Sequence, residues 1–184
     1  MAQAAIVNRL DRPVDIAVDH VLGPDRAPIT LVEYGSYACP YCRAANDRIA
    51  EVRDQLGERL RYVFRHRPLT GSDLALRAAE LVERAGTAEQ FWAAHVKLMT
   101  RSQVLTEDDL VAVAGDLGLE PREPGEAAQD IRRAAARVEA DIDSSHASGV
   151  HFTPTFFINE RRYDGPWDES SFLDAMQGTL GHRF

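Results

Sequence analysis

A strand that runs directly into an amphipathic helix constrains the fold of this chain more than any other feature. Residues 29–34 (ITLVEY) form a β-branched and aromatic run that predicts a buried strand. Residues 41–56 carry apolar side chains at steps of three and four, which predicts a helix that ends at Gly57. A second strand is predicted at 60–64, so the three elements form a β-α-β unit and predict an α/β fold.

The rest of the chain predicts a helical segment followed by further strands. Residues 72–148 have a helical apolar pattern almost throughout, strand character returns at 155–158 and 161–163, and a closing helix is expected at 168–176. An edge strand is expected at 14–18, where valine and isoleucine alternate with polar residues. The predicted parts are an N-terminal arm and edge strand at 1–28, an α/β domain with a mixed sheet at 29–71 and 149–184, and an all-helical insertion at 72–148.

Within the helical segment, three local features are expected. Thr87 and Gln90 have the spacing of a capping box at the start of a helix. Residues 121–125, which contain two prolines and a glycine, predict a loop. The long alanine-rich helix after this loop is expected to bury one stripe of side chains, namely Ile131, Ala135, Val138 and Ile142.

Charge and hydropathy argue against two classes of partner. The chain has 21 basic and 29 acidic residues, a formal charge of -8, whereas phosphate binding needs clustered Lys and Arg. No apolar run approaches the ~20 residues of a transmembrane helix, so neither nucleic acid binding nor membrane insertion is expected. The first residues lack the charged region and long apolar stretch of a signal peptide, and we therefore expect a cytoplasmic protein.

The chain has two cysteines, Cys39 and Cys42, at the predicted strand-to-helix junction. Their spacing on a helix puts both on one side with a Cα separation of ~5–6 Å, which suits a disulfide. A secreted disulfide scaffold would carry more cysteines, and zinc usually needs four ligands, for which the scattered histidines offer no cluster. Redox chemistry without a metal is favoured; a metal or cluster shared by two chains and inert thiols remain open.

The start of the helix favours a negative charge on Cys39. Free N–H groups and the helix dipole lower a thiol pKa there from about 8.5 to ~3.5–7.5. Pro40 fits the first turn because that position needs no hydrogen-bond donor. We expect an exposed, acidic Cys39 to be the nucleophile and Cys42, one turn deeper, to resolve the mixed disulfide.

Two polar positions outside the cysteine pair have both a functional and a structural interpretation. Glu33 lies within the first strand; facing the core, its carboxyl would have a raised pKa and could exchange a proton with Cys42, whereas on the other face it would be solvated. Pro154 could simply open the strand at 155–158. A cis bond after Thr153 would instead leave the Thr153 backbone free to pair with a bound peptide.

Other candidate residues have weaker signals. Phe91, Trp92 and His95 share one helix pattern and are expected to be core or structural residues. His151 could approach Cys39 and stabilise its thiolate, although the structural interpretation is preferred. Arg43 is expected to be a solvated side chain.

Four segments together resemble the DsbA-like branch of the thioredoxin superfamily. They are TLVEYGSYACPYC, FRHRPL, FWAAHVKLM and SGVHFTPTFFIN. The chain is similar to cytosolic thioredoxin-like proteins and to the thioredoxin-like domains fused to NhaA-type sodium/proton antiporters. The resemblance spans about residues 18–176 and implies a thioredoxin fold in which residues 72–148 form a helical insertion over the active-site cleft.

The resemblance also implies roles for individual residues. Cys39 matches the attacking cysteine, Cys42 the resolving one, and Glu33 the buried acid six positions before the motif. Pro154 matches the cis-proline and Thr153 the residue before it. We expect these last two residues to bind substrate, together with Pro40 and Tyr41 between the cysteines.

Two positions depart from the family pattern. Phe152 stands where related sequences often have glycine, and its ring could crowd or line the substrate groove. Asn159 and Glu160 replace the usual Asn-Gly hairpin turn, so a type I′ turn would strain Glu160.

The sequence therefore predicts a cytoplasmic thiol–disulfide oxidoreductase that reduces disulfides of proteins, peptides or small molecules. No cofactor is required, and glutathione or a thioredoxin-type system is expected to restore the dithiol. One alternative is a redox-switched binding or sensory module that acts on a transporter or regulator. A second alternative is a glutathione-linked transferase or isomerase, against which the presence of Cys42 counts.

Overall fold

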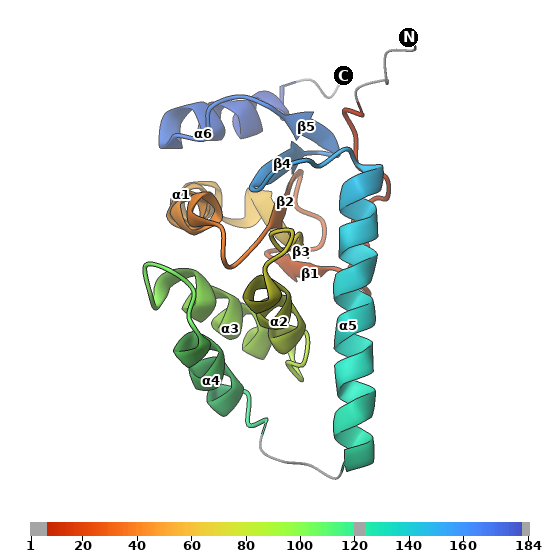
Figure 1. Cartoon of the computed structure of the whole chain (residues 1–184). Helices are drawn as coiled ribbons and strands as arrows, with labels where there is room; N and C mark the ends of the chain where they lie inside the picture. Colours follow the sequence, from red (N-terminus) through yellow and green to blue (C-terminus); the bar gives the residue numbers. More distant parts are fainter. Residues whose placement is uncertain (1–6, 120–123, 182–184) are drawn as a thin grey trace.

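The structure, a computed structural model, describes residues 7–119 and 124–181 and contains one five-stranded mixed sheet. The strands are β1 (His20–Leu22), β2 (Ile29–Gly35), β3 (Leu60–His66), β4 (Thr155–Ile158) and β5 (Arg161–Tyr163). They lie in the order β1-β3-β2-β4-β5, in which β2 and β3 are parallel and the other neighbours are antiparallel. The central position of β2 brings its C-terminal end beside the start of β4 (Figure 1).

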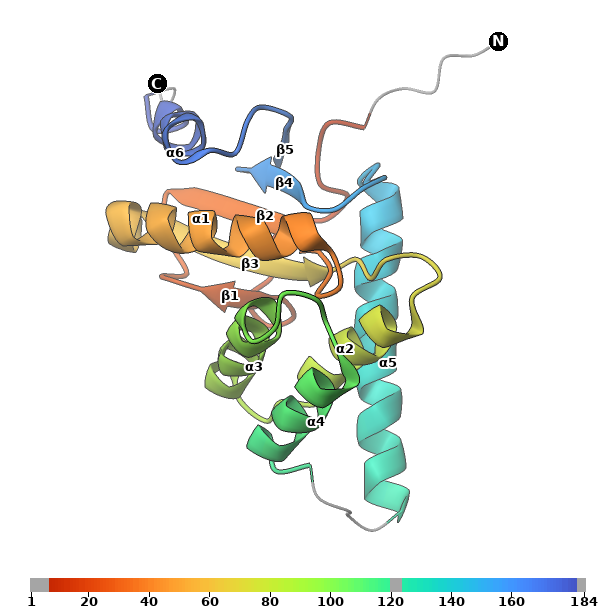
Figure 2. The same ribbon diagram turned by 60° about the vertical axis from the view of Figure 1, so that its left-hand side comes forward.

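Helices cover both faces of the sheet. They are α1 (Pro40–Leu56), α2 (Asp73–Val82), α3 (Ala88–Thr100), α4 (Glu107–Asp116), α5 (Pro124–Ala147) and α6 (Glu169–Gly178), with a 3-10 turn at Gly57–Arg59 after α1. In Figure 2, α1 crosses one face of the sheet, and the long α5 stands on the opposite side. The helices α2 to α5 all lie between β3 and β4 in the sequence. The expected α/β fold with an intervening helical segment is therefore present.

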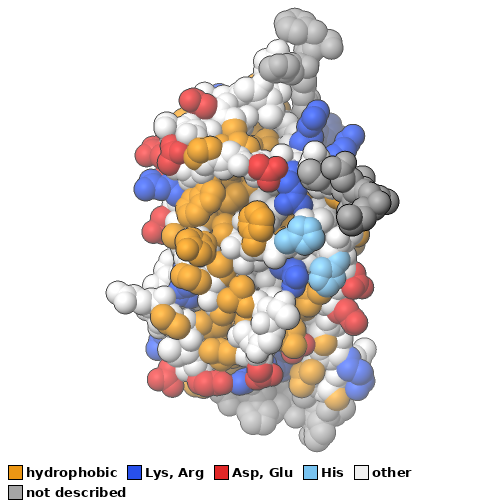
Figure 3. All heavy atoms as spheres, turned by 45° about the horizontal axis from the view of Figure 1, so that its top comes forward, with side chains coloured by type: hydrophobic (Ala, Val, Ile, Leu, Met, Phe, Trp, Pro, Cys, Tyr) orange, Lys and Arg blue, Asp and Glu red, His pale blue; other side chains and the backbone are white. Residues whose placement is uncertain are grey.

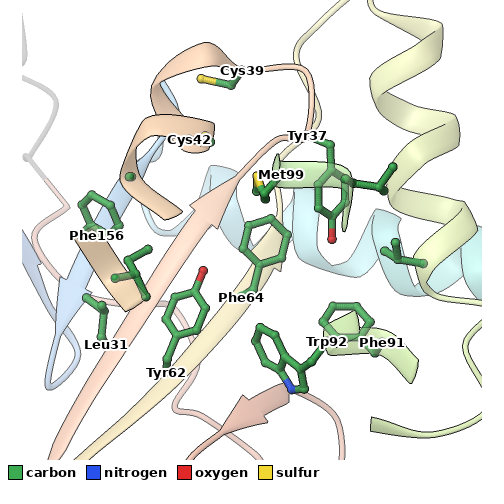
Figure 4. Packing of buried hydrophobic residues seen from close by; sticks show 14 of the residues in the cluster. Leu31, Tyr37, Cys39, Cys42, Tyr62, Phe64, Phe91, Trp92, Met99 and Phe156 are labelled. Atoms are coloured by element: carbon green, nitrogen blue, oxygen red, sulfur yellow. The ribbon is translucent and has the colours of Figure 1, made fainter. Parts of the chain in front are cut away.

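The larger hydrophobic cluster lies between the sheet, α1, α3 and α6. Successive side chains of a strand point to opposite faces, so Leu31 of β2 belongs to this cluster, whereas Val32 belongs to a smaller cluster on the other face. Figure 4 shows aromatic rings from two sources in the larger cluster: Tyr62 and Phe64 from β3, and Trp92 from α3. This core supports the helix that carries both cysteines.

The N-terminal arm differs from its prediction, because no strand forms at 14–18. Residues 16–18 form a turn, with Ile16 55% exposed, and the edge strand begins at His20. The cause is the buried carboxylate of Asp19, which accepts hydrogen bonds from the Asp15 N–H at 2.9 Å and from the Arg65 side chain at 2.9 and 3.0 Å. Satisfying this carboxylate bends the chain back on itself, which overrides the apolar alternation.

The buried face of α5 also differs from its prediction. Val138 is buried as expected, but Ile131 is 49% exposed, Ala135 and Ile142 are only partly buried, and Ala134 and Asp141 are buried instead. Asp141 accepts the His66 N–H at 2.9 Å and pairs with Arg137, so a polar contact with β3 sets the rotation of the helix.

The ends of the inserted helices were only partly predicted. Of the expected loop at 121–125, residues 121–123 lie outside the described residues, and Pro124 and Gly125 belong to α5. The Thr87 side chain accepts the Gln90 N–H, but the Gln90 side chain accepts from Gly86 rather than from Thr87, so the expected capping box is only half formed.

Candidate active site

The start of α1 places both cysteines beside the end of β2. Cys39 is the N-cap residue, and Pro40 opens the helix. Both thiols are free, and Cys42 is fully buried. Cys39 is only 3% exposed, so the expectation of an exposed nucleophile was wrong. The loop before β4 approaches it closely: Cys39 Sγ lies 3.3 Å from the backbone oxygen of Thr153.

The surroundings of Cys39 favour its thiolate. A hydrogen bond from the Cys42 thiol is the largest influence that lowers the Cys39 pKa, to about 5, and the backbone N–H groups of Tyr41 and Cys42 act in the same direction. Burial opposes this shift but does not cancel it. A thiol with this pKa is largely ionised at neutral pH, which is the form that attacks disulfides.

Cys42 has the opposite environment. Burial raises the pKa of its thiol far above the usual range, and the hydrogen bond to Cys39 and the charge of Glu33 add to this effect. The backbone N–H of Ser36 donates to Cys42 Sγ at 3.4 Å and partly offsets it. Near neutral pH the pair therefore consists of one thiolate, on Cys39, and one protonated thiol, on Cys42.

Glu33 lies on the core face of β2, on the same side as α1, and is 1% exposed. Burial is the largest cause of its raised pKa, about 8; the Cys39 charge raises the pKa further, and a hydrogen bond from Tyr62 lowers it. The Tyr62 hydroxyl donates to Glu33 Oε2 at 2.7 Å, whereas Oε1 is buried without a partner among the described residues. Figure 4 shows the Tyr62 hydroxyl pointing toward the helix of the cysteines.

Gly35 provides the space for this carboxyl group. A Cβ atom at this position would lie 2.7 Å from Glu33 Oε1 and 2.6 Å from the ring of Phe64, closer than such atoms approach. The glycine that ends β2 therefore lets an acidic side chain and an aromatic ring pack beneath the cysteine loop.

The loop before β4 completes the site. The Thr153–Pro154 peptide bond is cis, and Pro154 is buried. Pairing of β4 with β2 places this loop opposite the end of β2. Pro40 and Tyr41 are exposed on the other side of Cys39, and Tyr41 is 66% exposed. The structure thus brings all the predicted site residues into one region.

The loop before β4 also carries Phe152, which is 63% exposed. Its ring is therefore directed outward rather than packed in the core. Figure 3 shows one face of the molecule on which hydrophobic side chains gather within a margin of charged residues. An exposed apolar surface of this kind is typical of a binding site.

Two positioning residues were missed by the sequence analysis. The Ser36 hydroxyl accepts the N–H groups of Ala38 at 3.4 Å and Leu69 at 3.3 Å, and its carbonyl accepts the Cys39 N–H at 3.1 Å. Arg43 is not solvated as expected: it donates to the backbone oxygens of Tyr37 at 3.2 Å and Leu98 at 2.5 Å. These contacts fix the cysteine loop to α3 and to the loop after β3.

The aromatic cluster of α3 near the site is structural. The prediction that Phe91, Trp92 and His95 are core residues is confirmed, since all three are buried. Burial lowers the His95 pKa to about 3, and its Nδ1 lies 3.1 Å from the Tyr37 hydroxyl. His151 is exposed, and no contact between it and Cys39 is present among the described residues.

A second polar cluster lies at the C-terminal end of β3. His66, Glu83 and Asp141 have ligand-type atoms within 4.8 Å of one another. However, Glu83 Oε1 already contacts His66 at 2.8 Å and His20 at 2.9 Å, and Asp141 pairs with arginines. These partners satisfy the cluster without an ion, so we assign it to the packing of the helices against the sheet.

Comparison with known proteins identifies the family. A family model described as thioredoxin matches residues 16–177. The chain is 58% identical over 175 residues to a Na(+)/H(+) antiporter NhaA of Nitrosospira multiformis and 41% identical over 165 residues to NhaA 1 of Salinispora arenicola. These alignments cover 95% and 89% of this chain but 28% and 25% of the relatives, so the chain spans about a quarter of their length. No helix in the described part of the chain is long and apolar enough to cross a membrane.

Solved structures agree with this family. BdbD from Bacillus subtilis superposes with a TM-score of 0.74 at 23% identity, covering 97% of this chain and 100% of that one. A thioredoxin-like oxidoreductase from Silicibacter pomeroyi gives 0.73 at 24% identity, covering 89% and 92% of the two chains. The alpha-DsbA1 protein of Wolbachia pipientis gives 0.73 at 20% identity, covering 91% and 94%. The chain therefore belongs to the thioredoxin family and has a DsbA-like fold.

Proposed function

We propose that this chain is a thiol–disulfide oxidoreductase in which Cys39 attacks and Cys42 resolves. The observation that carries the proposal is the division of charge within the pair: a thiolate at the start of α1 and a protonated, fully buried partner one turn deeper. The thioredoxin family and the DsbA-like fold support the same chemistry. Neither a metal nor an organic cofactor takes part in it.

The proposed reaction has two exchange steps. The Cys39 thiolate attacks one sulfur of a substrate disulfide, the substrate S–S bond breaks, and the first substrate thiolate leaves. Cys42 then loses its proton, attacks Cys39 Sγ in the mixed disulfide, and releases the second substrate thiolate. The substrate gains two electrons, and the Cys39–Cys42 pair is left oxidised.

Glu33 is proposed to accept the proton of Cys42. Burial raises the Glu33 pKa to about 8 in the reduced site, and the negative charge of Cys39 contributes to this shift. When Cys39 enters the mixed disulfide this charge disappears, so the carboxyl ionises more readily at the moment when Cys42 must lose its proton. The unpartnered Oε1 is the oxygen available for this transfer.

Substrate is proposed to bind across the surface made by Pro40, Tyr41, Thr153 and Pro154. The first two are exposed beside Cys39, and the Thr153 carbonyl lies against its sulfur. An extended peptide could pair with the Thr153 backbone, as peptides do at exposed strand edges. Phe152 would then contribute apolar contact at the rim.

We propose reduction of disulfides in a reducing compartment, the cytoplasm, as the physiological direction. Both cysteines of the chain lie in the reactive pair, which leaves no structural disulfide to maintain. Glutathione or a thioredoxin-type system would restore the dithiol.

A redox titration against glutathione, with alkylation and mass spectrometry as readout, tests the proposal and its direction. A potential near the ~-200 to -230 mV of glutaredoxins supports a reductase, and one near ~-120 mV would make the protein an oxidant. Thiol content that stays constant across the whole range would contradict the redox function itself.

A second candidate is a redox-switched module that acts on a transporter. It is favoured by the relatives named as Na(+)/H(+) antiporters, of which this chain matches about a quarter. Steady turnover of an excess of protein disulfide, with dithiothreitol as the reductant, would support the enzyme over this alternative. Oxidation in a single event without turnover would support the switch. A glutathione-linked transferase is less favoured, because Cys42 supplies a resolving thiol.

A further inference from the structure

A small cavity lies between the loop after β3 and the loop before β4. Its volume is about 50 Å³, and its walls include Arg67, Leu69, His151, Phe152 and Thr153. A water molecule occupies ~30 Å³ of liquid volume, so the cavity accommodates a group of a few heavy atoms, such as a carboxylate.

Two buried polar atoms lie in the walls of this cavity. Arg67 Nε makes no hydrogen bond to any described residue, and Thr153 Oγ1 makes none of good geometry, although the Thr153 side chain faces Cys39 closely enough to help lower the pKa of that thiol. An unsatisfied buried polar group costs roughly 1–3 kcal/mol, so such groups usually mark a missing water or ligand. Both atoms can donate a hydrogen bond, and together they suit an acceptor group.

The charge of Arg67 is also not neutralised nearby. No ion pair between described residues includes Arg67, and the neighbouring acid, Asp73 at the start of α2, contacts Arg77 at 3.6 Å instead. His151, which is exposed at the rim, adds a ring N–H donor. A planar guanidinium beside a hydroxyl is well suited to hold a carboxylate.

The cavity adjoins the reactive sulfur and is held in place by backbone contacts. Thr153, one of its walls, places its carbonyl oxygen 3.3 Å from Cys39 Sγ. The Arg67 N–H donates to the Gly35 carbonyl at 2.8 Å, and the Leu69 N–H donates to the Ser36 hydroxyl. An anionic group in the cavity would therefore belong to the molecule that is exchanging with Cys39.

We propose that this cavity is a carboxylate subsite that selects small thiols and disulfides carrying a carboxylate near the sulfur, of which glutathione is the representative. This inference rests on the proposed function and specifies its small-molecule reductant. Arg67 and the Thr153 hydroxyl hold the carboxylate, and the thiol of the same molecule reaches Cys39 Sγ.

Reduction of the oxidised protein by glutathione consists of two thiol–disulfide exchange steps. A glutathione thiolate attacks Cys39 Sγ of the oxidised protein, the Cys39–Cys42 bond breaks, and Cys42 leaves as a thiolate that takes up a proton. A second glutathione thiolate attacks the glutathione sulfur of the mixed disulfide and releases Cys39. The protein gains two electrons, and two glutathione molecules become one disulfide.

The test compares glutathione with its diethyl ester as reductants of the oxidised full-length chain, with rates expressed per thiolate. For the unmodified chain we expect glutathione to react about tenfold faster, the factor that ~1.4 kcal/mol supplies. Arg67→Met should reduce this preference to about twofold or less, and Arg67→Lys should retain part of it. Arg26→Met, at an exposed turn before β2, is the matched control and should keep the full preference.

Dithiothreitol, which has no carboxylate, separates the possible failures. Equal rates with dithiothreitol for all variants would show that the proposed function stands. The subsite is then refuted if Arg67→Met keeps the full preference for glutathione, or if the unmodified chain reacts equally fast with glutathione and with its ester. If neither dithiothreitol nor glutathione reduces the pair, the proposed function itself fails, and the subsite with it. Equal thermal unfolding of Arg67→Met and the unmodified chain excludes a general loss of structure.

Discussion

At the scale of single residues, the site depends on groups whose protonation is set by burial and by one another. Cys39 and Cys42 are the same chemical group three positions apart, yet the pKa of one thiol lies far below that of the other. The hydrogen bond within the pair and the backbone N–H groups at the start of the helix lower the pKa of Cys39, whereas burial raises that of Cys42. Glu33 beneath them can respond to the charge on Cys39 because it is buried, where solvent screens a charge only weakly.

Replacement of Glu33 by glutamine should slow resolution of the mixed disulfide by about 10²-fold, because the acceptor for the Cys42 proton is lost. In the unmodified protein the rate of this step should rise with pH through the Glu33 pKa, about 8 in the reduced site and lower once Cys39 is uncharged. The measurement is stopped-flow release of the second substrate thiol across this pH range. A Glu33→Gln variant with an unchanged rate and pH profile would show that Glu33 does not accept the proton.

The raised pKa of Glu33 also predicts how the stability of the protein changes with pH. The folded-state pKa of Glu33 is raised to about 8 from an ordinary value near 4.5, so its burial costs stability progressively as pH rises through this interval. Glu33→Gln should therefore gain stability over the unmodified chain above pH 8, by an amount on the order of several kcal/mol. Urea unfolding at pH 5 and pH 9 measures this difference. An equal effect of the substitution at both pH values would contradict the raised pKa.

The cysteine pair and the acid before it could be predicted from the sequence, because their spacing is typical of a redox-active site. It could not decide which face of the strand Glu33 occupies; the pairing of β2 between β3 and β4 decides this. Ser36 and Arg43 were missed because they act on backbone atoms, which leave no pattern in the side chains. The burial of Cys39 was missed because the covering loop lies more than a hundred residues away in the sequence.

At the scale of elements, the start of α1 is held in place by its contacts with α3. Arg43 donates to the backbone oxygen of Leu98, near the end of α3, where the helix dipole favours a cation. The same side chain donates to Tyr37 in the cysteine loop. This one side chain thus adds polar contacts between the active-site region and the helical segment to their shared hydrophobic core.

Loss of this side chain should destabilise the protein. Arg43→Met should lower the free energy of unfolding by about 1.5–3 kcal/mol, since hydrogen bonds from a charged group are lost and two carbonyls lose their partner. Arg48→Met on the same helix, which removes an exposed pair with Glu51, should cost at most ~1 kcal/mol. Urea denaturation of the two variants makes the comparison. Equal destabilisation of both would show that Arg43 does not link the helices.

Two elements were predicted incorrectly for one physical reason. At 14–18 the apolar alternation predicts a strand, and on α5 the apolar stripe predicts that Ile131 is buried. In both places a buried carboxylate, Asp19 or Asp141, takes partners from distant segments and determines the local conformation. The cost of an unsatisfied buried charge exceeds the gain from one more buried aliphatic side chain.

At the scale of the whole molecule, buried ion pairs join the N-terminal arm, the sheet and the helical segment. Glu83 of the helical segment contacts His66 of β3 and His20 of β1. These partners hold the Glu83 pKa well below its usual range although burial opposes them. A carboxyl with a lowered folded-state pKa contributes stability above its ordinary pKa and loses it as the pH falls below that value.

Acid unfolding should therefore depend on Glu83. Glu83→Gln should reduce stability at pH 7 and flatten the decline of stability below about pH 4.5, because the titrating group is absent. Glu80→Gln, three residues earlier on α2, is the control and should leave the dependence of stability on acid pH unchanged. The measurement is urea unfolding from pH 7 to pH 3. A Glu83→Gln variant that keeps the full acid dependence would place the responsible group elsewhere.

The account as a whole rests on the ionisation of Cys39 beside a protonated Cys42, and thiolate absorbance in the ultraviolet measures it directly. Titration of the reduced protein should show one thiolate that forms near pH 5, absent in Cys39→Ser and shifted to higher pH in Cys42→Ala, which loses the hydrogen bond to Cys39. A titration in which both thiols ionise only at the ordinary value of about 8.5 would contradict the account.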